Sequence, residues 1–356
     1  MAKEKSILNS NALYTMIAIV IGFVVGAVLL SLAGISPIAA YGKLVSSVFE
    51  KPKYVVWAIT YATPLIFTGL SVAFSFRMGM FNIGAEGQFV VGGLAACVVG
   101  ILVDVPAIIH IPLCILAAIG AGAIWGILVG ILKIKRGINE VLSFIMFNWI
   151  AFYFSNYIIN LEVIHKVGGG EASKDILDSA SIKFPESVQT FLGCSSANIG
   201  IILAVIAAGV IWFILKKTTL GYKICAVGFN KNAAVYGGIN SNKTTLISMG
   251  ISGALAGIGG AVQVLGMSGR ISQFAGQEGY GFQGITVALI GASNPIGCVF
   301  AGFFYGAMKY GGSKLSLIDA PSEIVDIIMG TIIFFIAISH VFKMILKKQM
   351  LKKEGK

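Results

Sequence analysis

The sequence predicts an all-α membrane protein, a polytopic bundle of about ten transmembrane helices that includes a broken or re-entrant segment. Of the 356 residues, 57% are hydrophobic and only 12% are charged, whereas soluble domains carry about 25% charged residues. The mean hydropathy is +0.90. Long charge-free runs separate the charged residues, and a spanning helix needs about 20 predominantly apolar residues. Membrane-spanning strands are excluded because their alternating pattern of about ten residues is absent.

Each predicted helix occupies one of these runs or part of one, within a single membrane domain of residues 1–356. The first apolar stretch, residues 14–32, is longer than the core of a signal peptide and no A-x-A site follows it, so we expect it to be retained as a helix. The connections 161–197 and 217–243 are too long to be turns. The predicted helices are 14–34, 54–76, 88–103, 107–132, 139–160, 198–216, 244–266, 279–293, 296–312 and 322–345.

The basic residues predict the orientation of the chain. The net charge is +11, and the positive-inside rule explains this excess without nucleic acid as a partner. With a cytoplasmic N-terminus, ten helices return the C-terminus to the cytoplasm and place the lysine-rich 217–243 connection inside. The 161–197 connection is then extracytoplasmic. Three lysines count against this orientation: Lys43, Lys51 and Lys53.

Glycines are frequent within the predicted helices, 45 in the whole chain. Small residues let helix backbones approach closely in lipid, so a tightly packed bundle explains most of them. A weak internal similarity links the polar stretch at 81–88 with "GRISQFAGQEGYGFQG" at 269–284. An apolar segment follows each stretch. Because the preceding helices would run in opposite directions, the similarity favours inverted repeats.

The stretch "FRMGMFNIGAEGQFVVGG" at 76–93 places polar groups between two apolar segments. An uncompensated glutamate at the bilayer centre costs about 3 kcal/mol or more, so Glu86 should face the bundle interior or a cavity. Glycines around it favour a broken backbone. One interpretation is that these polar groups line a transport path. The alternative is a structural clamp in which Glu86 and Asn82 cap helix ends and Arg77 anchors the inner interface.

Further polar groups lie in apolar surroundings, among them Asn148 and Gln283. Amide side chains offer both donors and acceptors, which suits an uncharged polyhydroxyl or heterocyclic substrate. Aromatic rings such as Phe81 could stack on a base or sugar. Packing is the alternative role for each. The predicted path residues are Phe81, Asn82, Glu86, Gln88, Asn148 and Gln283.

The stretch "TLGYKICAVGFNKNAAVYGGINSNKT" at 219–244 predicts a short amphipathic helix between glycine turns. Its compact apolar patch favours insertion into a groove of a partner protein. Residues 238–244 read G-x-x-x-x-K-T, but Asn242 stands where a phosphate-binding loop requires glycine before the lysine. The chain therefore has no ATPase motif of its own, and catalytic motifs are absent as well. Three isolated histidines and five cysteines without a CxxC pair predict no metal site and no bound cofactor.

The two quoted stretches resemble permease subunits of ATP-binding-cassette (ABC) importers, in the family that serves branched-chain amino acids, simple sugars such as ribose, and nucleosides. "FNIGAEGQ" is similar to the nucleoside members that work with basic-membrane-protein lipoproteins. "GYKICAVGFNKNAAVYGGI" is similar to the family's G-x-x-x-x-A-V-G-x-N-x-x-A-A-x-x-x-G-I segment. Lys231 departs from the family pattern, which commonly has proline there.

This resemblance implies a bacterial plasma-membrane subunit that imports purine or pyrimidine nucleosides. It also implies a cytoplasmic ATPase partner that binds ATP and magnesium, a second permease that is different or identical, and an extracytoplasmic substrate-binding lipoprotein. The 217–243 connection would be the coupling segment that docks on the ATPase. The residues that the resemblance assigns to coupling are Gly221, Tyr222, Ala226, Val227, Gly228, Asn230, Ala233, Ala234, Gly238 and Ile239.

Two alternatives remain from the sequence. The same kind of permease could carry a sugar such as ribose or galactose, or a branched-chain amino acid. A neutral cargo is favoured over these amino acids because the predicted spans hold few fixed charges. A more distant alternative is an ion-coupled secondary transporter that uses embedded carboxylates, although such a carrier has no use for a coupling segment.

Overall fold

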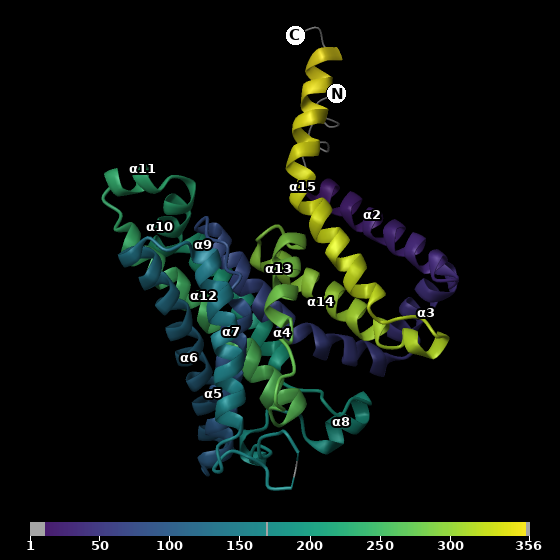
Figure 1. Cartoon of the computed structure of the whole chain (residues 1–356), viewed down its shortest axis with the longest axis vertical. Helices are drawn as coiled ribbons and strands as arrows, with labels where there is room; N and C mark the ends of the chain where they lie inside the picture. Colours follow the sequence, from purple (N-terminus) through teal and green to yellow (C-terminus); the bar gives the residue numbers. More distant parts are fainter. Residues whose placement is uncertain (1–10, 169, 354–356) are drawn as a thin grey trace. The chain divides into compact units, whose positions relative to one another are not determined.

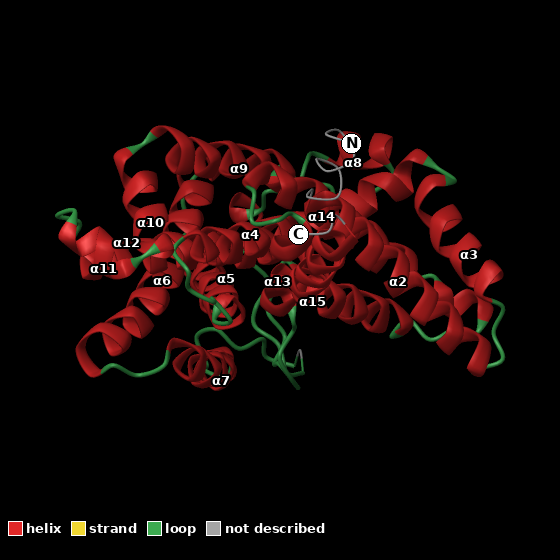
Figure 2. Cartoon of the chain, turned by 90° about the horizontal axis from the view of Figure 1, so that it is seen from above, coloured by secondary structure: helices red, strands yellow, loops and turns green. Residues whose placement is uncertain are grey.

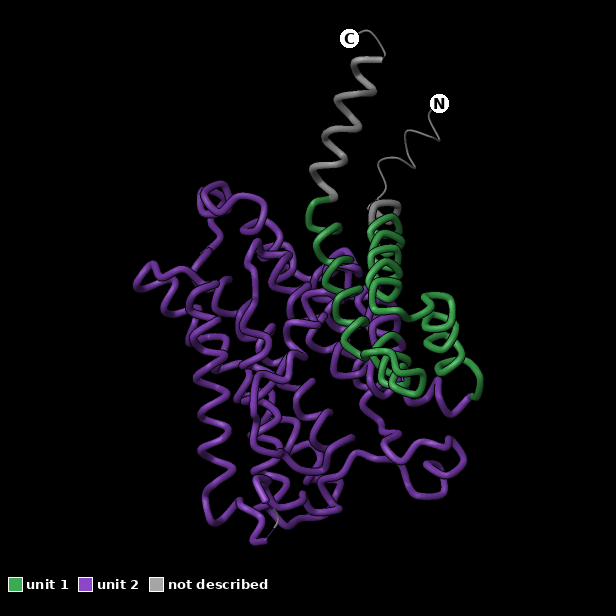
Figure 3. Tube along the Cα trace, turned by 45° about the vertical axis from the view of Figure 1, so that its right-hand side comes forward, with its two compact units in different colours: residues 1–51, 308–356 green, residues 52–307 purple. Residues whose placement is uncertain are grey.

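The computed structural model describes residues 11–168 and 170–353. Over these residues the regular structure is helical (Figure 2), and β-pairing is limited to isolated bridges such as His165 with Ser173. The chain divides into two compact units (Figure 3), unit 1 with residues 1–51 and 308–356 and unit 2 with residues 52–307. The all-α prediction is confirmed.

Unit 2 contains most of the helices, and their bounds follow the charge-free runs of the sequence. Helix α14 begins in unit 2 and ends in unit 1. The elements are α4 (Pro52–Arg77), α5 (Ala85–Leu102), α6 (Ala107–Arg136), α7 (Glu140–Ile159), η1 (Asp178–Ala180), α8 (Glu186–Leu192), α9 (Gly200–Lys217), α10 (Thr219–Phe229), α11 (Lys231–Tyr236), α12 (Ser241–Gln263), the π-helix η2 (Val264–Ser268), α13 (Tyr280–Ile290) and α14 (Pro295–Gly312).

Unit 1 pairs the two terminal helices of the described chain. Its elements are α2 (Asn11–Leu32), α3 (Pro37–Phe49), η3 (Leu315–Ile318) and α15 (Ile324–Lys353). Helix α2 packs along α15, where Gly22 lies against Ile332. The Tyr41 hydroxyl of α3 donates a hydrogen bond of 2.5 Å to the Phe23 carbonyl and fixes α3 against α2.

All ten predicted helices are present in the described residues, and α3 and α8 are additional ones. In the part of the chain that the structure describes, seven helices are long and apolar enough to cross a membrane, and two shorter apolar helices cover Tyr280–Ile290 and Ile324–Ile338. Helix α3 begins with Ser36 as its N-cap, whose hydroxyl accepts from the Ala39 amide, and with Pro37 in its first turn. Both are start signals that the sequence shows.

Close backbone contacts hold α5, α6 and α12 together. A Cβ atom at Gly257 of α12 would overlap with the Ala118 carbonyl oxygen of α6. A Cβ atom at Gly92 of α5 would overlap with the Gly257 Cα atom. These three helices therefore meet at a distance that only glycine permits, as expected for helices packed within a membrane.

Unit 2 has two ends (Figure 1). Helices α10 and α11 lie at one end, and α8 lies with the 161–197 connection at the other. Helix α4 ends at Arg77, and Gly79 follows it with a φ of 72°, which reverses the chain. Residues 80–84 then turn back into the bundle, so that Asn82 lies beside Ser71, six positions before the end of α4. Helix α5 therefore begins inside the bundle.

A second helix also begins inside the bundle. After η2, residues 269–279 run without regular structure from the 161–197 connection, where the Ser173 amide donates to the Ile271 carbonyl at 2.9 Å. They end where α13 starts against the first turn of α5, because a Cβ atom at Gly281 would overlap with the Glu86 amide nitrogen. The two polar breaks noted in the sequence thus meet in space, which supports the predicted broken segment. Inverted repeats stay a prediction.

Candidate functional site

The first group of predicted path residues is a buried polar cluster between α4, α5 and α12. The Asn82 side-chain amide donates to Gln88 Oε1 at 2.9 Å and to Ser252 Oγ at 2.8 Å. The Ser252 hydroxyl donates in turn to the Ser71 carbonyl at 2.8 Å. Asn82 and Gln88 are each 1% exposed. Every bond here satisfies a group that would be costly to bury alone, so the cluster ties three helices together.

Glu86 is 1% exposed and joins α5 to α13. Its carboxylate accepts hydrogen bonds from the Gly279 amide at 2.7 Å and from the Gly281 amide at 2.6 Å. These amides belong to the first turn of α13, where a helix has unpaired donors and the positive end of its dipole. Glu86 therefore caps a helix almost 200 positions away in the chain. The structural-clamp alternative predicts such a helix-capping role for Glu86. In this conformation the cap holds the first turn of α13 against the first turn of α5, and we call this contact the joint between α5 and α13.

Asn148 of α7 holds the turn between α4 and α5 from the other side. Its amide nitrogen donates to the Ile83 carbonyl at 3.1 Å, and its side-chain oxygen accepts from the Gly87 amide at 2.9 Å. Phe81 is half-buried and stacks on Phe76, with ring centroids 5.3 Å apart. Gln283 is half-buried in the first turn of α13. Four of the six predicted path residues are thus buried together, and Phe81 and Gln283 lie at the edge.

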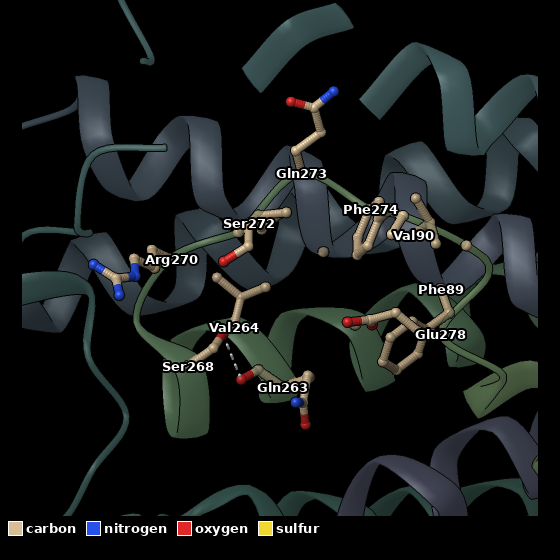
Figure 4. A pocket seen from close by; sticks show the side chains of 15 residues that line it. Phe89, Val90, Gln263, Val264, Ser268, Arg270, Ser272, Gln273, Phe274 and Glu278 are labelled. Carbon is tan, nitrogen blue, oxygen red and sulfur yellow. Dashed lines mark hydrogen bonds between the residues drawn. The ribbon is translucent and has the colours of Figure 1, made fainter. Parts of the chain in front are cut away.

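A cavity of about 320 Å³ lies beside this group, between α5, α12, η2 and residues 269–279. None of the six predicted path residues lines it. Phe89 and Val90 come from α5, Val264 from η2, and Phe274 and Glu278 from the irregular segment. Figure 4 shows the Glu278 carboxylate directed toward the middle of the cavity and Gln273 directed away from it. The signal that could have found it is the polar stretch 269–284, from which sequence reasoning took Gln283 alone as a path residue.

Charged side chains surround the outer rim of the cavity. Asp175 in the 161–197 connection pairs with Lys166 at 2.5 Å and with Arg270 at 3.6 Å. The hydrogen bond from Lys166 holds the pKa of the Asp175 carboxyl below its usual range. Both pairs are exposed, and the pair of Asp175 with Arg270 links the irregular segment to the connection. Over the described residues, no group of three or more histidine, cysteine, aspartate or glutamate side chains could hold a metal ion.

The predicted coupling segment forms two short helices, α10 and α11, that meet at Asn230. Asn230 closes α10, and its side-chain oxygen accepts from the Ala233 amide at 3.0 Å to cap α11. Lys231 occupies the first position of α11, where proline fits as well, so this departure from the family pattern leaves the helix start intact.

Some of the predicted coupling residues face the bundle. A Cβ atom at Gly228 would overlap with the Arg77 carbonyl oxygen at the end of α4, and one at Gly221 would overlap with the Ile214 carbonyl oxygen of α9. Val227 and Ala234 are buried as well. These residues hold α10 and α11 against the other helices of unit 2. The half-buried positions are Ala226, Gly228 and Ile239, and the exposed ones are Tyr222, Asn230, Ala233 and Gly238.

Two aromatic residues that sequence reasoning did not select are almost fully exposed in this segment. Phe229 is 95% exposed and Tyr236 is 94% exposed. They end α10 and α11, so we name Phe229 and Tyr236 together the aromatic tip. Aromatic side chains exposed in this way are available for contact with a partner or with lipid.

Comparisons with known proteins agree with these features. Residues 54–337 match the family described as the branched-chain amino acid transport system permease component. The chain is 40% identical to the guanosine ABC transporter permease protein NupP of Bacillus subtilis, over 97% of this chain and 98% of that protein. It is 35% identical to the nucleoside ABC transporter permease protein NupB of Lactococcus lactis, over 95% and 94%.

A third relative is named for another cargo. The chain is 30% identical to the glucose ABC transporter permease protein TsgB13 of Haloferax volcanii, over 92% of this chain and 87% of that protein. No solved structure matches the chain.

Proposed function

Because the chain belongs to the family of branched-chain amino acid transport system permease components, we propose that it is the permease subunit of an ABC importer for nucleosides. The observation that carries this proposal is the likeness to two permeases named for guanosine and for nucleosides, at 40% and 35% identity over nearly the whole of both chains. The long apolar helices fit a multi-pass membrane protein.

ATP is hydrolysed on a separate ATPase subunit, which docks on α10 and α11. The aromatic tip supports this assignment, because a helix that inserts into a groove anchors itself through exposed apolar side chains. The same contact argues against an ion-coupled carrier, which needs no such surface. We propose that this end of unit 2 and both termini lie in the cytoplasm, and that the 161–197 connection faces the substrate-binding lipoprotein outside a bacterial cell.

Transport requires the joint between α5 and α13 to open. In the present conformation Glu86, Asn82 and Gln88 are buried, each with 1% of its surface exposed. Movement of the coupling segment when ATP binds would reach the end of α4 through the contact of Gly228 with Arg77. Phe81, Asn82, Glu86, Gln88, Asn148 and Gln283 would then border the path, next to a second permease subunit.

The sugar alternative is supported by the likeness to a permease named for glucose at 30% identity. The ribose of guanosine and of other ribonucleosides carries neighbouring hydroxyl groups, and so does glucose. We therefore propose that the permease handles the sugar part of its cargo and that nucleosides are the favoured form.

Uptake of radiolabelled guanosine, adenosine, uridine and ribose, in cells with and without the gene, tests the proposed function. We expect nucleoside uptake to be lost with the gene and ribose uptake to persist. Loss of ribose uptake alone would show that the cargo is a sugar and not a nucleoside. Purification of the tagged chain should also bring down an ATPase subunit, and its absence under conditions that preserve other ABC complexes would contradict the ABC assignment.

A further inference from the structure

We propose that the cavity between α5, η2 and residues 269–279 is a nucleoside-binding site in which the Glu278 carboxylate accepts hydrogen bonds from the neighbouring 2′- and 3′-hydroxyls of the ribose. This inference rests on the proposed function and deepens it. The base lies against the aromatic side chains of the cavity, Phe89 and Phe274.

The charges of the cavity select the class of ligand. Two charged residues line it, Arg270 and Glu278. Arg270 pairs with Asp175 at 3.6 Å, and Figure 4 shows its side chain directed away from the middle of the cavity. The Glu278 carboxylate is therefore the charged group that is directed into the cavity. An ionised carboxylate only accepts hydrogen bonds, so it favours a neutral ligand rich in donors and repels phosphorylated compounds.

The shape and the walls favour a nucleoside. The cavity of about 320 Å³ lies at the small end of ligand sites, which hold about 300–1,000 Å³. A carboxylate has two oxygens side by side, and vicinal hydroxyls present two donors at a matching separation. Phe274 approaches from the irregular segment and Phe89 from α5, on opposite sides of the space in Figure 4. Their rings supply apolar contact for a planar base.

The position of the cavity suits a site on the path. Its outer rim is fastened to the 161–197 connection, where the Gln273 amide donates to the Glu171 carbonyl at 2.7 Å. At its inner end, Glu278 precedes Gly279, whose amide is held by Glu86 at 2.7 Å. Phe89 stacks on Tyr280, the first residue of α13, with ring centroids 4.9 Å apart. A ligand bound to Glu278 and Phe89 therefore touches α5 and the segment that leads into α13.

The first test compares guanosine with 2′-deoxyguanosine as cargo of the complete transporter in cells. Initial uptake rates are measured for the wild type, for Glu278→Gln and for Glu186→Gln, a control at an exposed carboxylate on α8. All three use the same binding protein, so a changed preference arises in this chain. We expect the wild type to prefer guanosine and Glu278→Gln to reduce this preference about tenfold or more, as for a lost charged hydrogen bond.

A second variant tests the cavity without removing a charge. Gly276 lines the cavity, and a Cβ atom there meets no atom within 4 Å. Gly276→Leu should therefore fold and reach the membrane but occupy the cavity and abolish uptake of every nucleoside. Gly209→Leu on α9 is the matched control, since its Cβ also meets nothing within 4 Å. Protein abundance in the membrane is measured for both variants.

Each outcome decides between the site and the proposed function. Equal rates for guanosine and 2′-deoxyguanosine in the wild type, or an unchanged preference in Glu278→Gln, would overturn the ribose contact. A changed preference for guanosine over inosine alone would also overturn it, because the carboxylate would then contact the guanine edge. Normal uptake by Gly276→Leu would overturn the cavity as a site. Only a wild type that takes up no nucleoside would remove the proposed function itself.

Discussion

Glu86 and Gly279, which lie 193 positions apart in the chain, are joined by a hydrogen bond of 2.7 Å that closes the start of α13 onto the start of α5. The Gly281 amide adds a second bond to the same carboxylate at 2.6 Å. Two helices that begin inside the bundle thus depend on one buried carboxylate. This relationship gives the first prediction.

Glu86→Gln should destabilise the protein and impair transport. The amide keeps one acceptor oxygen but places an NH₂ group against a backbone amide that also donates, so a charged hydrogen bond is lost and a donor is left unsatisfied. We expect a loss of about 1–3 kcal/mol in the free energy of unfolding. Thermal unfolding of the purified complex and guanosine uptake measure it. Glu186→Gln is the exposed control, and an equal melting temperature in both variants would contradict the cap.

Substitution of the aromatic tip should uncouple the chain from its ATPase. Phe229→Asp and Tyr236→Asp place charges where we propose an apolar groove of the partner, while both residues are almost fully exposed in this chain, so its own fold should persist. We expect the ATPase to be lost on purification and guanosine uptake to stop. Phe191→Asp, at an aromatic residue of α8 that is 88% exposed, is the control. Retained ATPase in both tip variants would remove the docking role.

Gly257→Val should disrupt the contact of α5, α6 and α12. Its side chain would overlap with the Ala118 carbonyl oxygen, and backbone cannot give way as a flexible side chain can. Overpacking of this kind costs about 1–3 kcal/mol or more. Membrane abundance and detergent resistance should fall, whereas Gly209→Val, where the added Cβ meets nothing within 4 Å, should behave as the wild type. Equal membrane abundance of Gly257→Val and Gly209→Val would contradict the close contact of α12 with α6.

The pair of Asp175 with Lys166 should give the 161–197 connection a dependence on acid pH. The hydrogen bond from Lys166 lowers the pKa of Asp175 in the folded chain. The resulting stabilisation is present above the unfolded pKa of about 3.9, and it is lost as the pH falls through the lowered folded pKa. Both side chains are exposed, so the effect is small.

Hydrogen exchange of residues 164–176, corrected for its intrinsic pH dependence, measures this effect. Protection should stay constant from neutral pH down to about pH 5 and fall below about pH 4. In Asp175→Asn, protection at neutral pH should already be as low as that of the wild type below about pH 4. Glu162→Gln, at another exposed carboxyl of the same connection, should not.

The sequence predicted the helices well because charge-free length is a local property. All ten expected helices are present, while α3 and the short α8 were missed, α3 although Ser36 and Pro37 mark its start. The burial of Glu86 was also predictable, since a carboxylate in an apolar run must find partners. Its partners were not, because Gly279 and Gly281 are brought to it only by the path of residues 269–279. The cavity escaped for the same reason, since α5, η2 and residues 269–279 each supply part of its wall.

The contact of Gly228 with Arg77 has a mechanical consequence. Backbone lies directly on backbone there, and Gly79 returns the contact with its Cβ position 3.3 Å from the Gly228 carbonyl oxygen. Side chains change rotamer and absorb small displacements, whereas packed backbone is nearly incompressible. We therefore expect a displacement of α10 to be transmitted to the end of α4 and to the turn that carries Asn82. Under the proposed function, a displacement of α10 by the ATPase would therefore act on the polar cluster around Asn82.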